Sequence, residues 1–316
     1  MGIVWALVIV VVGFLLGLVF QKKNPNHSRK VSILFSKSSL FFLIPFSVLS
    51  SLWQMPRITA QLIYLPLIGA AVIGVGAAVG FIYRRYFQLT AHQFGALLPV
   101  TTFYNLGALG NLIVFVTIGE NGVALLALFK LCEELIYFGW AFPYSRTLGR
   151  TSSVTGDEKT RFWKDPIFII AISAVVLGIL MNQSQIARPT IFTEIIQLTV
   201  PLSSFLMIMA VGMTFNIIGG GKWIKLGIFS SIMRSTLSVI VVMTLISLFD
   251  LWSVYQGDLA RVCLLLAVMP TAFMSVLPSV LYDLDKSLAN TVWLISFLTS
   301  VAVIPFTIAL FPLLGI

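Results

Sequence analysis

Charged side chains are scarce in this sequence. Only 10% of its 316 residues are Asp, Glu, Lys or Arg, whereas 59% are hydrophobic. A soluble globular domain is usually about a quarter charged, so a surface this poor in charge needs lipid around it. The chain is therefore predicted to be a multi-pass protein of a cell membrane, and the composition argues strongly against a soluble enzyme.

Long polar segments and enzyme motifs are missing as well. The longest polar stretch, at about residues 146–165, is too short to bury a core of its own, so the chain has no room for an ATPase domain. No phosphate-binding loop is present, because Gly221-Lys222 is followed by Trp223. H-E-x-x-H and G-x-S-x-G are absent too, and the two cysteines lie in apolar runs that predict no disulfide framework. We therefore expect neither an ATP-driven pump nor an enzyme, and no metal or cofactor.

Ten apolar runs are long enough to cross a bilayer, which takes about 20 residues as a helix. The first has no basic residue before it, so it is predicted to be a spanning helix and not a signal peptide. Numbered one to ten, the predicted spans are 3–20, 33–53, 62–83, 92–116, 121–143, 165–182, 191–216, 223–249, 259–281 and 287–314.

Basic residues concentrate in alternate loops. Fifteen Lys and Arg fall in or beside the odd-numbered loops, against three in or beside the even-numbered ones. The loops rich in Lys and Arg stay cytoplasmic in membrane proteins, so both termini are predicted on the non-cytoplasmic side. This distribution also explains the net charge of +9 without nucleic acid as a partner.

The ten spans divide into two sets of five, at 1–145 and 165–316, joined by a cytoplasmic loop at 146–164. Because each set has an odd number of spans, the second is inserted upside down relative to the first. Proline lies in the second and fourth span of each set, at Pro45, Pro99, Pro201 and Pro270. Interrupted helices at matching positions are typical of inverted repeats in secondary transporters, although proline is also common in membrane helices in general.

Span four has the composition of a broken helix. Pro99 removes a backbone donor, and Asn105, Gly107, Gly110 and Asn111 follow within twelve residues. Unwound backbone survives at membrane depth only where protein or water satisfies it, so Asn105, Asn111 and the freed backbone groups become candidate ligands. The alternative is a face of small residues that packs against another helix.

Span nine carries Pro270 and Pro278, with Thr271 and Ser275 between them. Two prolines eight residues apart predict a break or a kink near mid-span. We expect a break that crosses the one in span four, which adds Pro270, Thr271 and Ser275 to the candidate substrate site. A simple kink is the alternative.

Four charged residues lie inside spans five and eight. Lys130 sits near the bilayer centre with Glu133 and Glu134 one turn away, and Arg234 lies within span eight. Intramembrane charges are expensive and usually functional, so these four are candidate ion-coupling residues. One of the paired carboxylates is a candidate proton carrier, because two neighbouring carboxylates in a low dielectric do not both ionise readily. A static, charge-compensated cluster is the alternative, and Arg234 either pairs with these carboxylates or attracts an anionic substrate.

The segment Asn105-Leu-Gly107-Ala-Leu-Gly110 resembles the N-x-G-x-x-G motif of the auxin efflux carrier family, whose bacterial members are often called malate or hydroxycarboxylate permeases. Further similarities lie at Pro45, at Pro201 with Gly212, at Met269-Pro270, at Leu281-Tyr282-Asp283 and at Ser287. The sequence departs from the family at Leu112, where proline is usual.

The resemblance implies the fold shared with bile-acid sodium symporters: an all-α membrane protein of ten helices in two inverted repeats. A panel of helices one, two, six and seven faces a core of helices three to five and eight to ten. Broken helices four and nine cross in the core, and Asn105, Gly107, Gly110 and Pro270 would lie at the crossing. The sodium-binding carboxylate that those symporters carry on helix nine has no counterpart here between Val262 and Tyr282.

The resulting functional prediction is a secondary transporter for a small organic anion, working by elevator-type alternating access with a proton as candidate coupling ion. A sodium-coupled symporter is one alternative, and a membrane sensor that binds a ligand without transporting it is another. Gly13-x-x-x-Gly17 and Gly76-x-x-x-Gly80 are suited to pack helices within or between chains, so a homodimer stays open.

Overall fold

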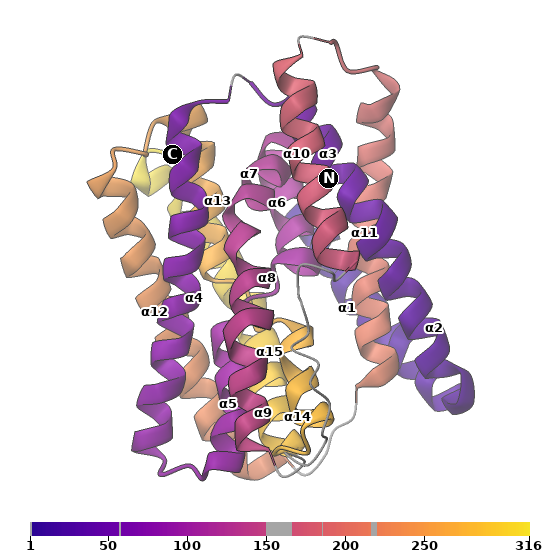
Figure 1. Ribbon diagram of the computed structural model, residues 1–316, viewed down its shortest axis with the longest axis vertical. Helices are drawn as coiled ribbons and strands as arrows, with labels where there is room; N and C mark the ends of the chain where they lie inside the picture. Colours follow the sequence, from indigo (N-terminus) through magenta and orange to yellow (C-terminus); the bar gives the residue numbers. More distant parts are fainter. Residues whose placement is uncertain (1, 57, 150–165, 185, 216–219) are drawn as a thin grey trace. The chain divides into compact units, whose positions relative to one another are not determined.

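The computed structural model describes residues 2–56, 58–149, 166–184, 186–215 and 220–316. These ranges are mainly helical and hold no β-sheet (Figure 1), so the prediction of an all-helical protein is confirmed. Most of the loop predicted at 146–164 lies outside the described residues. The α-helices are α1 (Ile3–Lys23), α2 (Pro25–Ser38), α3 (Ile44–Gln54), α4 (Tyr64–Tyr86), α5 (Ala91–Thr102), α6 (Asn111–Ile118), α7 (Glu120–Phe129), α8 (Glu133–Ile136), α9 (Phe142–Leu148), α10 (Pro166–Gln183), α11 (Ile191–Thr214), α12 (Ile224–Leu248), α13 (Asp258–Ala267), α14 (Leu277–Leu281) and α15 (Lys286–Leu310).

Seven helical segments in the described ranges are long and apolar enough to cross a membrane. Each overlaps one of the ten spans predicted from the sequence, which supports a membrane-embedded protein. They are Ile3–Lys23, Pro25–Gln54, Ala60–Tyr86, Pro166–Gln183, Ile191–Thr214, Gly221–Leu248 and Lys286–Leu314.

The other three predicted spans, 92–116, 121–143 and 259–281, are interrupted. In the first, α5 ends at Thr102 and a π turn, η3 (Leu106–Gly110), precedes α6. In the third, α13 ends at Ala267 and helix resumes only at η9 (Phe273–Val276). These interruptions explain why no long continuous helix is found in these spans.

The predicted span 121–143 was expected to be an ordinary helix, and the structure differs. A 3-10 turn, η4 (Lys130–Cys132), and a π turn, η5 (Tyr137–Ala141), divide it into α7, α8 and α9. The π turn comes just before Pro143, as another π turn, η1 (Ser39–Leu43), comes just before Pro45. Proline cannot donate to the carbonyl one turn back, and a widened turn is one way for a helix to accommodate it.

The described residues group into two units by their internal contacts, and each unit draws on both halves of the sequence. The first unit comprises Met1–Ile63, Leu106–Leu128 and Trp163–Phe215. The second comprises Tyr64–Asn105, Phe129–Phe162 and Asn216–Ile316.

Within the first unit, α1 and α11 pack with their backbones in contact. A Cβ atom added at Gly17 would lie 2.3 Å from the carbonyl oxygen of Met209, and one at Gly212 would lie 2.3 Å from that of Phe14. Only glycine leaves room for this approach, so the Gly13-x-x-x-Gly17 pattern packs helices inside one chain. Gly76 of α4 does the same against the backbone of α5 in the second unit, and Gly80 leaves room for the Thr101 side chain.

Serine hydroxyls also join helices in the first unit. Ser28 and Ser32 of α2 donate to the carbonyl oxygens of Met213 and Ala210 in α11, the second at 2.9 Å. Ser47 of α3 lies 3.0 Å from the hydroxyl of Thr199. Short polar side chains satisfy one another here without the cost of burying a charge.

One ion pair of the first unit is largely shielded from solvent. Arg188, whose side chain is 3% exposed, binds the carboxylate of Glu120 at 2.5 Å. It also donates to Ser50, at both its carbonyl and its hydroxyl oxygen, and to the hydroxyl of Thr193. The pair thereby ties the start of α7 to α3 and to the start of α11.

We predict that Gly17→Ala lowers the thermal stability of the purified protein in detergent. The new methyl group collides with the backbone of α11, and overpacking of this kind costs about 1–3 kcal/mol. Gly74→Ala on α4 is the matched control, because a Cβ atom there meets nothing within 4 Å. Equal melting temperatures for the two variants would contradict the close approach of α1 and α11.

Candidate functional site

The interruptions after α5 and α13 meet within the second unit. The amide of Asn105 donates to the carbonyl oxygen of Pro270 at 2.7 Å, and the amide of Ala272 donates to that of Phe103 at 3.1 Å. These two bonds make Tyr104 and Thr271 an antiparallel bridge. Each interruption therefore satisfies backbone groups of the other, as non-helical backbone inside a membrane protein requires.

The sequence explains the second interruption better than the first. Pro270 has no amide hydrogen and disfavours helical geometry at Met269, so α13 ends just before them. In the first, Pro99 lies inside α5 and the helix continues to Thr102. The break therefore falls inside the predicted region from Pro99 to Asn111, one turn after the proline. The extended residues are Phe103 to Asn105, which pair with the other interruption.

Arg234 of α12 binds both interruptions. Its side chain is buried, with only 2% of the residue exposed. One terminal nitrogen, Nη2, donates to the carbonyl oxygen of Met269 at 2.9 Å. The other, Nη1, donates to the hydroxyl of Thr271 at 2.9 Å and faces three carbonyl oxygens at the end of α5, at 3.3–3.5 Å. One guanidinium thus links α12 to the two chain segments that meet.

Thr271 and Ser296 complete this hydrogen-bond network. The hydroxyl of Thr271 donates to the carbonyl oxygen of Val100 at 2.7 Å, and its amide donates to the hydroxyl of Ser296 at 2.9 Å. Ser296 also accepts from Nη2 of Arg234 at 3.2 Å. Thr271 was predicted from its place between two prolines, whereas Ser296 of α15 was missed because nothing distinguishes it from other serines in apolar helices.

Tyr104 was also missed. Its ring lies under the guanidinium, with the Arg234 Cζ atom 4.3 Å from the ring centre, in the geometry of a cation–π contact. Its hydroxyl lies 2.7 Å from that of Ser238, one helical turn beyond Arg234 on α12. Its position as an aromatic residue next to a predicted break was the signal that could have identified it.

The ion pair considered for Arg234 is absent from the described part of the chain. All of its hydrogen-bond acceptors are carbonyl or hydroxyl oxygens, and neither Glu133 nor Glu134 is among them. Arg234 is therefore a buried cation held by neutral oxygen atoms. A carboxylate partner was expected for Arg234, and the carbonyl groups of two helix ends take its place.

Lys130, Glu133 and Glu134 are half-buried where η4 passes into α8. Among the described residues no ion pair within 4 Å joins Lys130 to either carboxylate, so the expected close pairing is not formed. One turn further on, the Tyr137 hydroxyl donates to the carbonyl oxygen of Met274 at 2.5 Å. This bond connects the segment that carries the carboxylates to η9, just after the interruption.

The other candidate residues divide between the units. Ser275 lies in η9 of the second unit, where its hydroxyl donates to the carbonyl oxygen of Ala272. Gly107, Gly110 and Asn111 belong to the first unit. There Asn111 is 2% exposed, and neither amide atom of its side chain has a hydrogen-bond partner among the described residues.

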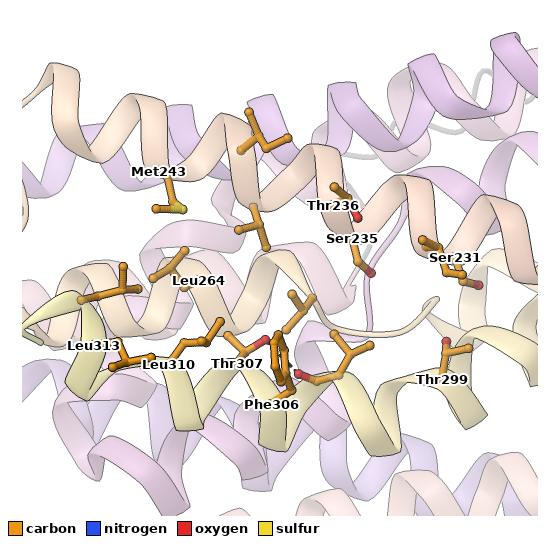
Figure 2. Close-up of a pocket in the computed structure, with 16 residues that line it drawn as sticks. Ser231, Ser235, Thr236, Met243, Leu264, Thr299, Phe306, Thr307, Leu310 and Leu313 are labelled. Atoms are coloured by element: carbon orange, nitrogen blue, oxygen red, sulfur yellow. Dashed lines mark hydrogen bonds between the residues drawn. The ribbon is translucent and has the colours of Figure 1, made fainter.

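A separate cavity of about 450 Å³ lies between α12, α13 and α15 in the second unit. Figure 2 shows Met243, Leu264 and Leu313 at one end and Ser231 and Thr299 at the other. The lining is mainly apolar with a few hydroxyl groups. None of the predicted site residues lines this cavity.

Comparison with known proteins does not assign the chain. No family model matches it, and no curated protein matches it. The resemblance to auxin efflux carriers therefore stays a prediction based on short motifs.

We predict that Ser296→Ala destabilises the purified protein by about 1–3 kcal/mol, because it leaves the Thr271 amide and one Arg234 donor without this acceptor. Ser300→Ala is the matched control. Ser300 is similarly buried on the same helix, but its hydroxyl donates only to the carbonyl oxygen of Phe297 one turn back. Thermal unfolding in detergent measures the difference, and equal losses for the two variants would contradict the network.

Proposed function

We propose that this chain is a secondary transporter for a small organic anion in a cell membrane, with the auxin efflux carriers as its family. One observation carries the proposal: two interrupted segments of apolar, membrane-type helices meet at a buried positive charge. Secondary transporters use such discontinuous helices to place backbone groups near the bilayer midplane, where substrates bind. A protein that only needed to span the membrane would gain nothing from breaking these helices.

The sign of the charge favours an anionic substrate. Arg234 is buried without a carboxylate in its hydrogen-bond shell, and guanidinium groups stay protonated in proteins. The helix-end carbonyl groups offset this charge only in part, so we propose that the surroundings of Asn105, Pro270 and Thr271 keep a positive potential. A carboxylate gains from such a potential because the low dielectric screens it weakly.

We further propose ten spans in two inverted five-helix repeats, with both termini on the non-cytoplasmic side. The seven continuous apolar helices and the three interrupted spans together make ten. Interruptions in the fourth span of each half are compatible with a repeat. The basic residues of α1 and α2, including Lys22, Lys23 and Arg29, are exposed, as side chains in a cytoplasmic loop should be.

The proposed mechanism is alternating access by movement of one group of helices against the other. Support comes from the division of the chain into two units, each built from both halves of the sequence. This is the division that an elevator mechanism needs. The predicted panel and core differ from it in detail, since Leu106–Leu128 groups with the panel segments.

We predict that Asn105→Ala abolishes transport while the protein is still expressed and folded. Its backbone amide bonds the second interruption, and its side chain stands where the substrate is proposed to bind. The assay is counterflow of radiolabelled L-malate in proteoliposomes, after a thermal-shift screen of mono- and dicarboxylates has tested whether malate binds best. Asn121→Ala, at the start of α7, is the control. Binding of a carboxylate without counterflow would favour the sensor alternative, and unchanged uptake in Asn105→Ala would reject the site.

We predict that the pH dependence of transport originates in Glu133 and Glu134. Both are half-buried, with Lys130 and Tyr137 nearby on the same span, and Tyr137 bonds the segment after Pro270. If protons couple to transport here, Glu133→Gln and Glu134→Gln should flatten the profile of initial rate against pH. Glu194→Gln, an exposed carboxylate at the start of α11, should not. A profile that survives both substitutions would remove these carboxylates as proton carriers.

A further inference from the structure

Arg234 lies deep in an apolar helix. It is ten residues from the start of α12, or about 15 Å along the helix axis, which is half the thickness of a hydrocarbon core. A charge at this depth is costly unless the surrounding groups compensate it. What compensates Arg234 therefore indicates its role.

The groups around the guanidinium form an oxygen cage without a carboxylate. Four are backbone carbonyl oxygens: Val100 at 3.3 Å, Thr101 at 3.4 Å and Phe103 at 3.5 Å near the end of α5, and Met269 at 2.9 Å just after α13. The other two are the hydroxyls of Thr271 and Ser296. Unwound carbonyls and half-helix C-termini of this kind are what coordinate sodium in transporters with broken helices.

The field of the two helix ends favours a cation at this point. The last carbonyls of a helix have no partner within it, and they carry roughly half a negative charge together. Two such ends meet here among buried residues of the second unit. A positive charge between them compensates both at once.

We propose that the Arg234 guanidinium occupies a site built for an alkali-metal cation and makes the protein independent of one. The cation in this cage is a side chain of α12. No free ion therefore has to bind for the two interruptions to stay together. Arg234 is thus a positioning residue for the meeting segments. It is not a direct hydrogen-bond ligand of the substrate, since both terminal nitrogens are already engaged by the cage.

Removing the side chain should expose the cation site. Arg234→Ala leaves the oxygen atoms in place around an empty volume, and its melting temperature in detergent should fall by roughly 5–10 °C in choline chloride. Low-millimolar guanidinium chloride or sodium chloride should recover at least half of that loss. The wild-type protein should show no such shift, because its cage is filled.

Two further variants separate charge from volume. Arg234→Met removes the charge but fills the space, so it should be destabilised without recovery by either salt. Arg234→Lys keeps a cation at the site and should retain most of the stability, which gives a usable readout if Arg234→Ala does not fold. Arg261→Ala, which removes an ion pair with Asp258, is the control for general salt effects.

Failure of either stability result would overturn the inference. It is wrong if neither salt stabilises Arg234→Ala more than choline does, or, where that variant does not fold, if Arg234→Lys is as unstable as Arg234→Met.

The consequence for transport rests on the proposed function, and it is tested in wild-type proteoliposomes by replacing sodium with choline at fixed membrane potential. Unchanged malate counterflow supports the inference. Sodium-dependent counterflow overturns the inference but is consistent with a transporter. Absence of counterflow in both salts rejects the transporter, and the cation site is then decided by the stability measurements alone.

Discussion

Unsatisfied carbonyl groups at the ends of two broken helices are the constraint on which this structure depends. A membrane helix normally satisfies its own backbone, and breaking it inside the bilayer exposes polar groups that lipid cannot solvate. Here the break after Thr102 and the break after Ala267 solve that problem together. Two backbone hydrogen bonds join them, and the guanidinium of Arg234 binds carbonyl groups of both.

The lipid environment also explains how the other helices pack. The hydrophobic effect does little to hold helices together in lipid, so close backbone approach and short hydrogen bonds take its place. Gly17 against Gly212, Gly76 against Thr101 and Thr102, and the serines of α2 against α11 are the means used here. Two arginines with nearly buried side chains are stabilised in the same way: Arg188, which pairs with Glu120, and Arg234 in its cage.

The sequence predicted what depends on local composition. Apolar runs of about 20 residues gave the seven continuous helices, and Pro270 marked one interruption because its missing amide has a local effect. The other interruption falls within the predicted region from Pro99 to Asn111, but its exact position could not be predicted because it is set by pairing with a segment 167 residues away in the chain. The partners of Arg234 could not be found from sequence, since four of them are backbone carbonyls that any residue carries. Tyr104 and Ser296 were missed for the related reason that their roles arise from the cage they help to form.

The ion pair of Arg188 with Glu120 has a consequence for the first unit as a whole. All eight tyrosines and both cysteines of the chain lie in the second unit. In the described part of the first unit, Glu194 and His27 are exposed, and Glu120 is paired with the guanidinium of Arg188. The described part of this unit therefore buries no carboxylate without a cation beside it, and it acts as an electrostatically quiet support. The half-buried pair Glu133 and Glu134, by contrast, lies in the second unit.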